Sequence, residues 1–143
     1  MNLWRSVTRL FTPQPARPVH PPPDFVMEPD PEEIAVPEIS AATLRTALAG
    51  DAPPLLLDIR ESYEWRQVRI PAAHHIPMNE VPQRLDELAA AAEIVVICAH
   101  GSRSYGVAAY LIEQGLPATS LTGGITRWAS EGGAVEMGAT RMG

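Results

Sequence analysis

The fold is decided by the stretch Glu93-Ile94-Val95-Val96-Ile97-Cys98-Ala99-His100-Gly101-Ser102-Arg103-Ser104. Its first half is apolar and rich in β-branched residues, which predicts a strand that is buried on both faces. Its second half is a polar loop with a glycine, and a helical pattern over Tyr105–Gln114 follows, ended by Gly115. A buried strand, a tight loop and a helix in succession are typical of an α/β protein with a parallel sheet.

Strands and helices continue to alternate on both sides of this stretch, from about Val36 onward. Ser40 is a suitable N-cap for the first helix, which Gly50 ends. The further elements predicted are helices at Ala41–Leu48, Glu61–Trp65, Val81–Ala92 and from Gly124 through Trp128, and strands at Pro54–Ile59, His75–Pro77 and Ala118–Leu121. We therefore expect a parallel sheet that is covered by helices on both faces.

The composition indicates one globular domain behind a proline-rich segment. The chain has 143 residues, of which 45% are hydrophobic and 20% charged, too few residues for two independent cores. Nine of the 15 prolines lie between Pro13 and Pro37, so residues 12–34 are predicted to form an extended linker. The predicted organisation is an N-terminal extension at 1–34, a folded domain at 35–134 and a C-terminal tail at 135–143.

The charge balance and the single cysteine exclude several classes of protein. The net charge is −6, and all 11 basic residues are arginines, so a nucleic-acid partner is not expected. No apolar run reaches the roughly 18 residues that are typical of a membrane-spanning helix. One cysteine excludes an internal disulfide and a disulfide-stapled secreted scaffold. We expect a cytoplasmic protein.

The first eleven residues have a pattern of their own, with apolar residues at helical spacing and arginines between them. Such a segment is compatible with a short amphipathic helix on a membrane surface or a partner, or with the start of a targeting segment. A frayed terminus is the interpretation that we favour, because the segment is too short to anchor stably.

Cys98 is the candidate catalytic residue. It closes a predicted strand at the carboxyl edge of the sheet, where α/β proteins bind their ligands. The backbone N–H groups and the dipole of the following helix favour thiolate over thiol, and Arg103 adds a cation. The thiolate is the nucleophilic form, and the same loop would hold an anionic substrate. The alternative is an inert core cysteine, which the polar loop after Cys98 argues against.

Three motifs in this order and spacing resemble the single-domain rhodanese (sulfurtransferase) family: Leu57–Glu61, Cys98–Ser104 and Gly123–Trp128. The resemblance covers about residues 36–133. It implies an α/β, rhodanese-like fold with a central parallel sheet of about five strands flanked by helices on both faces. It also implies that Cys98 takes sulfane sulfur from thiosulfate or a low-molecular-weight persulfide. The Cys98 persulfide would then pass the sulfur to a thiol or to cyanide.

The resemblance also assigns roles within the loop. Cys98 would carry the sulfur, and Arg103 would be a second catalytic residue that supplies charge and closes the loop. Backbone amides would cradle the persulfide and its donor, with the substrate-binding residues Ala99, His100, Gly101, Ser102, Arg103 and Ser104. The family needs no metal and no organic cofactor, and none is expected here. The expected partners are a small anionic sulfur donor, a thiol acceptor or a partner protein.

The sequence departs from the family pattern in two places. The family usually has Gly-His-Ile-Pro-Gly-Ala where this chain has Val68-Arg69-Ile70-Pro71-Ala72-Ala73, which puts the geometry of that turn in question. Ala99 stands where the family often places a cation. Fewer fixed charges should weaken the binding of thiosulfate and favour a persulfide donor.

Two other functions are compatible with parts of the pattern. Cysteine phosphatases and some arsenate reductases also have a cysteine-to-arginine loop, but they place five residues between the two, whereas four separate Cys98 from Arg103. The shorter loop suits one sulfur atom better than a phosphoryl group. A non-catalytic rhodanese-like binding module is the other alternative, and the presence of Cys98 argues against it.

Several neighbouring residues have both a functional and a structural interpretation. Asp58 and Arg60 could orient the cysteine loop, by which we mean Cys98–Ser104. An ion pair that stabilises a turn is the preferred interpretation. His100 could shuttle protons or simply line the pocket mouth. Gly123 and Gly124 could form a second anion-binding nest, although such pairs more often permit a turn with positive φ.

Overall fold

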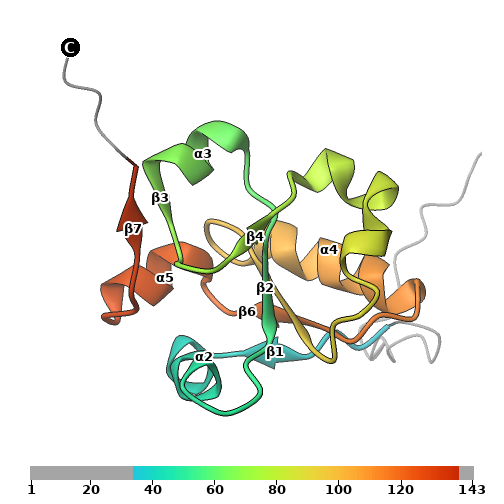
Figure 1. Ribbon diagram of the computed structural model, residues 1–143, viewed down its shortest axis with the longest axis horizontal. Coiled ribbons are helices and arrows are strands. Elements are labelled where there is room, and N and C mark those ends of the chain that lie inside the picture. The colour runs from blue at the N-terminus through green and yellow to red at the C-terminus, as the bar shows by residue number, and fades with distance from the viewer. Residues whose placement is uncertain (1–33, 139–143) are drawn as a thin grey trace, which may run out of the picture. The chain divides into compact units, whose positions relative to one another are not determined.

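Five parallel strands form the central sheet, in the order β1-β6-β5-β2-β4 (Figure 1). Their bounds in this computed structural model, which describes residues 34–138, are β1 Glu38–Ile39, β2 Leu55–Asp58, β4 His74–His75, β5 Ile94–Ile97 and β6 Ala118–Leu121. The predicted segment at 1–11, most of the 12–34 linker and the last five residues of the predicted tail lie outside the described residues. The prediction of a parallel sheet of about five strands is confirmed.

The apolar strand β5 occupies the centre of the sheet. It pairs with β6 on one side and with β2 on the other, and all four of its residues are buried. A strand in this position meets a helical layer on each face, so every side chain must be apolar. This explains why the sequence shows a continuous apolar run here and no alternation.

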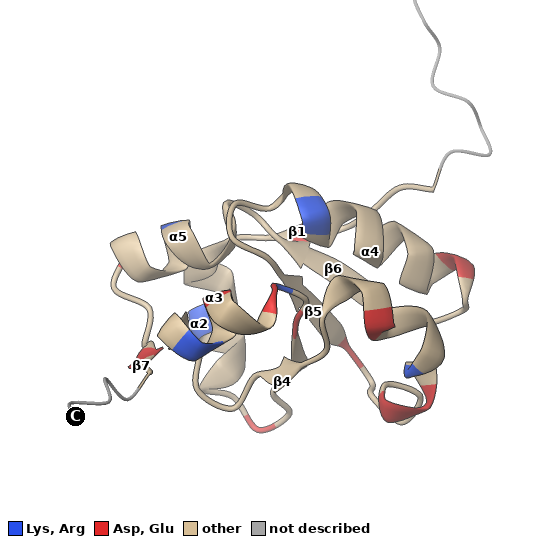
Figure 2. Ribbon diagram, turned by 90° about the horizontal axis from the view of Figure 1, so that it is seen from above, with Lys and Arg blue, Asp and Glu red and all other residues tan. Residues whose placement is uncertain are grey.

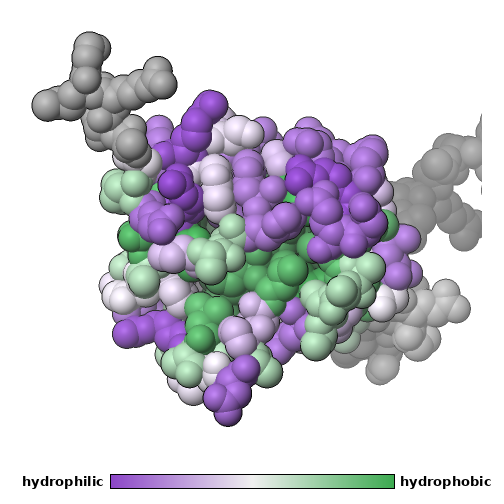
Figure 3. Space-filling model, in the orientation of Figure 1, coloured by the Kyte–Doolittle hydropathy of each residue, from purple (hydrophilic) through white to green (hydrophobic). Residues whose placement is uncertain are grey.

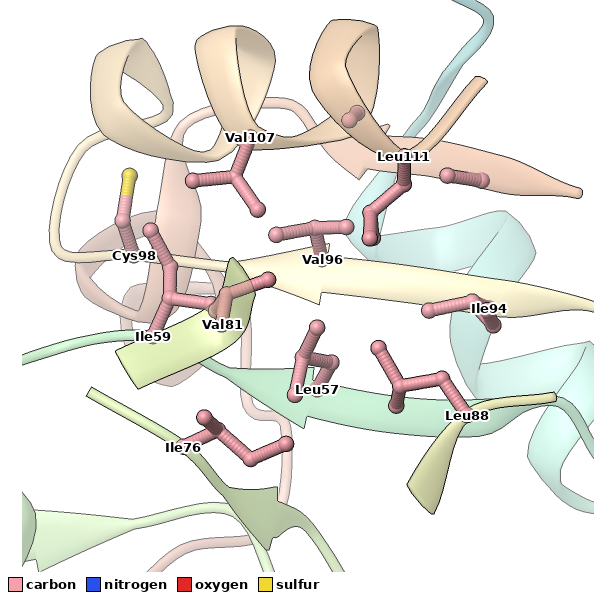
Figure 4. Close-up of a cluster of buried hydrophobic side chains, with 12 residues drawn as sticks. Leu57, Ile59, Ile76, Val81, Leu88, Ile94, Val96, Cys98, Val107 and Leu111 are labelled. Carbon is pink, nitrogen blue, oxygen red and sulfur yellow. The ribbon is translucent and has the colours of Figure 1, made fainter. Parts of the chain in front are cut away.

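One face of the sheet is covered by α4 (Ser102–Glu113) and by two short 3₁₀ helices, η1 (Met78–Gln83) and η2 (Leu85–Glu87). Figure 4 shows Val107 and Leu111 directed from α4 towards Val96 on β5, and Cys98 at one end of the same cluster. The buried members of this cluster are Leu57, Ile59, Ile76, Val81, Leu88, Ile94, Val96, Cys98, Val107, Ala108, Leu111 and Ala118.

The other face is covered by α2 (Ala41–Leu48) and α5 (Gly124–Ser130). Its buried cluster consists of Ala41, Leu44, Leu56, Ile70, Val95, Ile97, Leu121, Ile125 and Trp128. Adjacent residues of β5 thus point into different layers, as strand geometry requires. The predicted arrangement of helices on both faces is confirmed, and it places the start of α4 directly after the end of β5.

The predicted helix Val81–Ala92 is wrong. In its place the chain forms η1 and η2, whose turns close through hydrogen bonds from Arg84 N to Val81 O and from Leu88 N to Leu85 O, both i to i−3. Pro82 has no N–H to donate, and Arg84 leaves the helical region with φ −124° and ψ 24°. Val81 and Leu88 are buried as the apolar spacing predicts, but the backbone between them is not an α-helix.

A second, two-stranded sheet was not predicted. Strand β3 (Val68–Arg69), which follows α3 (Ser62–Gln67), pairs antiparallel with β7 (Glu136–Met137). The segment that was predicted to be a C-terminal tail thus begins with a paired strand. Two-residue strands are too short to show an alternating pattern, and the same reason explains why β1 was missed.

Candidate active site

The cysteine loop leaves the sheet at the end of β5 and turns at once into α4. Gly101 is the N-cap of α4 and has φ 103°, a left-handed conformation that favours glycine. A Cβ at Gly101 would lie 3.1 Å from the N atom of Gly123, so the loop also depends on a close approach to the next turn. The loop and the first turn of this 12-residue helix thereby turn the backbone N–H groups of His100, Gly101 and Ser104 towards Cys98.

The sulfur of Cys98 accepts a hydrogen bond from the backbone N of Gly101 at 3.0 Å and lies 3.3 Å from the Ser104 Oγ. Burial raises the pKa of the thiol. The Ser104 hydroxyl and the backbone N–H groups of Ser104, Gly101 and His100 lower it by more, so the pKa of Cys98 lies below its ordinary value. Hydrogen bonds to the charged form stabilise that form, and the loop therefore favours the thiolate.

Cys98 is more deeply buried than the sequence indicated. Its exposed fraction is 0%, and it belongs to the core cluster under α4. The prediction that Cys98 would not be packed as a core residue is wrong, because the loop folds back over the sulfur. The residue is nevertheless unlike an inert core cysteine, since polar groups contact its sulfur on the loop side.

Arg103 is paired with a carboxylate that the sequence did not single out. Its Nη2 and Nη1 donate to the Oε1 and Oε2 of Glu64 at 3.0 and 3.1 Å. These hydrogen bonds hold the pKa of Glu64 below its usual value against the opposing effect of burial, and they raise the pKa of Arg103. The guanidinium thus closes the loop against α3, and much of its charge is neutralised there.

Glu64 is held in place by its own helix. Its Oε2 accepts a hydrogen bond from the backbone N of Glu61 at 2.8 Å, within a reciprocal capping box at the start of α3. The glutamate three residues after a helix N-cap was a readable signal for this cap. Nothing in the sequence could show that the same carboxylate reaches Arg103, 39 residues away.

Asp58 and Arg60 form the ion pair that was predicted to stabilise a turn. The Arg60 Nη2 lies 2.8 Å from the Asp58 Oδ2, with both side chains buried, and the same Nη2 donates to the carbonyl of Val68 at 2.6 Å. The pair joins the end of β2 to the end of α3. It supports the helix that carries Glu64, through hydrogen bonds from Arg60 to the carbonyls of Glu64 and Val68.

Gly123 and Gly124 form a turn with positive φ, at 75° and 62°. A Cβ at Gly124 would collide with the carbonyl groups of Cys98 and Ala99. The next two residues, Ile125 and Thr126, donate their backbone N–H groups to these carbonyls, at 2.9 and 3.1 Å. The turn interpretation is therefore confirmed, and the N–H groups of Ile125 and Thr126 bind the cysteine loop itself.

The remaining predicted substrate-binding residues lie around the same loop. Ser104 is buried, Ala99 and Gly101 are half-buried, and His100 and Ser102 are exposed. One residue that the sequence interpretation missed is Ser120 on β6, whose Oγ lies 2.8 Å from the Ser104 Oγ. A serine in a short strand that also holds Thr119 gave no clear signal for it.

The described residues contain neither a candidate metal site nor a candidate membrane-spanning helix. Between Ile34 and Gly138 there is no group of three His, Cys, Asp or Glu side chains that could hold a metal ion. No helix in that range is both long enough and apolar enough to cross a membrane. In Figure 2 the basic positions are spread over several elements and form no continuous stripe across the molecule.

These features define an α/β domain with a cysteine cradled between the central strand and the helix that follows it. The model of the rhodanese-like domain family matches residues 40–131. A sulfurtransferase of Allochromatium vinosum is 40% identical over 96 residues, which are 66% of this chain and 90% of that protein.

Solved structures give the same result. A rhodanese-related protein of Thermoplasma volcanium matches with a TM-score of 0.65 and 33% identity, covering 70% of this chain and 97% of that one. A rhodanese-like domain protein of Staphylococcus aureus matches with a TM-score of 0.66 and 30% identity, covering 73% and 100%. The chain belongs to the rhodanese-like domain family.

Proposed function

We propose that the protein is a sulfurtransferase in which Cys98 carries sulfane sulfur as a persulfide. The observation that carries this proposal is the loop between β5 and α4, which lowers the pKa of the only cysteine in the chain through hydroxyl and amide hydrogen bonds. The identity to a relative named a sulfurtransferase supports the same chemistry.

The reaction has two nucleophilic steps. The Cys98 thiolate attacks the outer sulfur of the donor, a new S–S bond forms, and the donor leaves with the electron pair of the broken S–S bond. An acceptor thiolate, or cyanide, then attacks the outer sulfur of the Cys98 persulfide. The bond to Sγ breaks, and Cys98 returns as the thiolate. No electrons are gained or lost overall, so this chain needs no redox cofactor for the transfer.

The loop would stabilise charge at both stages. The N–H groups of His100, Gly101 and Ser104 face the sulfur, and the dipole of α4 adds to their effect. Arg103 contributes as the residue that closes the loop through Glu64. We assign the substrate-binding role to the loop from Ala99 to Ser104, with Cys98 and Arg103 as the catalytic pair.

We favour a low-molecular-weight persulfide over thiosulfate as the donor. The Glu64 carboxylate occupies two N–H donors of Arg103, so a small dianion gains little from this cation. Beside the loop lies a pocket of about 370 Å³. It is lined by Ser102, Arg103 and Gly106 and by the apolar residues Met78, Val81, Pro82, Val107 and Tyr110. Hydrophobic residues also gather across the middle of the face shown in Figure 3. Such a surface suits an organic donor.

The competing assignment as a phosphatase finds less support. Four residues separate Cys98 from Arg103, and Arg103 is held by Glu64. A phosphoryl group would need donors around all of its oxygens, which a short loop with a neutralised arginine supplies poorly.

The test is the intact mass of the protein after incubation with thiosulfate or with glutathione persulfide. We expect a gain of one sulfur atom that dithiothreitol removes, and faster loading by the persulfide. Cys98→Ser should show no gain and no transfer to cyanide, with an unchanged circular dichroism spectrum. Transfer by Cys98→Ser, or the absence of loading in the wild-type protein with both donors, would contradict the proposal.

A further inference from the structure

Ser120 is a buried polar side chain that the proposed sulfur transfer does not use. It lies on β6 with an exposed fraction of 0%, opposite Val96 of β5. Among residues 34–138, its hydroxyl has one hydrogen bond, which joins its Oγ to the Ser104 Oγ at 2.8 Å. A hydroxyl in a core costs free energy unless it is satisfied, so its single partner is informative.

The direction of this hydrogen bond follows from counting protons. The Ser104 hydroxyl has one proton and two lone pairs, and three groups lie around its Oγ: Gly101 O at 3.1 Å, Ser120 Oγ at 2.8 Å and Cys98 Sγ at 3.3 Å. The carbonyl of Gly101 can only accept. While Cys98 is a thiol, Ser104 therefore donates to Gly101 O and accepts from the two others. Ser120 is the donor to Ser104.

Ionisation of Cys98 changes two of these three hydrogen bonds and leaves the third in place. A thiolate can only accept, so the Ser104 proton turns from Gly101 O to the sulfur. The Ser120 hydroxyl still donates to the Ser104 Oγ, since the structure shows no other acceptor beside it among the described residues. A hydroxyl that accepts a hydrogen bond becomes a stronger donor. The series of hydrogen bonds from Ser120 to Ser104 and from Ser104 to the sulfur of Cys98 is therefore better ordered when the sulfur is charged.

From this geometry we infer that Ser120 is a positioning residue, which acts through Ser104 to strengthen the hydrogen bond that the Ser104 hydroxyl donates to the Cys98 sulfur whenever that sulfur is negatively charged. The inference deepens the proposed function, because it matters for transfer only if Cys98 is the sulfur carrier. The same donor would serve the thiolate that leaves when the persulfide gives up its outer sulfur. Ser120 itself does not touch the substrate.

The ionisation of Cys98 tests this without any sulfur donor, through the ultraviolet absorbance of its thiolate measured against pH, with Cys98→Ser as the blank. Ser104→Ala should raise the pKa of Cys98 by about one to two units, the weight of a hydrogen bond to a charged group. Ser120→Ala should raise it by about 0.3 of a unit, roughly a twofold fall in the acid dissociation constant, because such coupling strengthens a hydrogen bond by about 10–30%. Ser120→Thr, which keeps the hydroxyl, should restore the wild-type midpoint.

The double variant decides between positioning and packing. In the Ser104→Ala background, Ser120→Ala should leave the midpoint where Ser104→Ala alone puts it, because the path to the sulfur is already broken. An unchanged midpoint in the single Ser120→Ala variant would overturn the inference, and so would an equal shift in both backgrounds. A melting temperature that falls while the midpoint stays fixed would assign Ser120 to packing alone. If the midpoints behave as expected but the wild-type protein moves no sulfur, the proposed function fails and the positioning role of Ser120 stands.

Discussion

Replacing Gly124 by alanine should displace the cysteine loop while leaving the sheet intact. Gly124 has φ 62°, and a Cβ at this position would overlap the carbonyl groups of Cys98 and Ala99. The backbone of the loop must then move away from α5. The hydrogen bonds from Ile125 N to Cys98 O and from Thr126 N to Ala99 O, at 2.9 and 3.1 Å, would be stretched or lost.

The cost can be worked out from these contacts. An alanine in the left-handed region costs about 1 kcal/mol relative to glycine, and each lost backbone hydrogen bond costs about 1 kcal/mol. We therefore expect Gly124→Ala to lower the free energy of unfolding by about 3 kcal/mol. A displacement of roughly 1 Å at a reacting group lowers a rate by about 100-fold, so sulfur loading of Cys98, the proposed nucleophile, should fall by that order.

Gly115→Ala is the matched control. Gly115 also has a positive φ, 82°, but a Cβ there meets no atom within 4 Å. This variant should lose only about 1 kcal/mol of stability and keep its loading rate. The assays are urea denaturation and intact-mass loading with glutathione persulfide on both variants. If Gly124→Ala loads sulfur at the wild-type rate, or if Gly115→Ala slows loading equally, the proposed dependence on the α5 turn is refuted.

Two further predictions concern Arg103 and Ala72, the second with a control at Ala73. Arg103→Ala removes a positive charge near the thiolate, which should raise the pKa of Cys98 and shift the pH profile of its alkylation by iodoacetamide upward, with a slower reaction at neutral pH. An unchanged profile would mean that the hydroxyl and the amides suffice and that Arg103 is structural. Ala72 has φ 64° where the family usually has glycine, so Ala72→Gly should raise the free energy of unfolding by about 0.5–1 kcal/mol. Ala73→Gly, at a position without positive φ, should lower it by a similar amount, and a stabilisation there would contradict the strain argument.

The sequence predicted the parts of the fold whose signal is local. The apolar run of β5, the Ser40 cap of α2 and the glycine after α4 each indicated one element correctly, because burial and capping leave marks on neighbouring residues. The helix predicted at Val81–Ala92 failed because the apolar spacing there describes which side chains are buried, and a 3₁₀ path buries the same ones. The strands β1, β3 and β7 have two residues each, which is too short for an alternation of apolar and polar residues to show in the sequence.

The candidate site divides in the same way. The position of Cys98 between a strand and a helix was readable, because its neighbours in sequence build its surroundings. The partners that come from elsewhere in the chain were not. Glu64 meets Arg103 from α3, and Ser120 meets Ser104 from β6, contacts that only the packing of the elements can produce. The full burial of Cys98 was also hidden, because it depends on how the loop folds back over the sulfur.

The two hydrogen bonds from α5 have an electronic consequence. A peptide group whose carbonyl accepts a hydrogen bond is polarised, and its N–H becomes a stronger donor. Thr126 donates to the carbonyl of Ala99, and the N–H of that same peptide belongs to His100, one of the groups that lower the pKa of Cys98. The sulfur is thus served by two helices from opposite faces of the sheet. The start of α4 acts on the sulfur directly. Helix α5 acts on it indirectly, through the peptide group that joins Ala99 to His100.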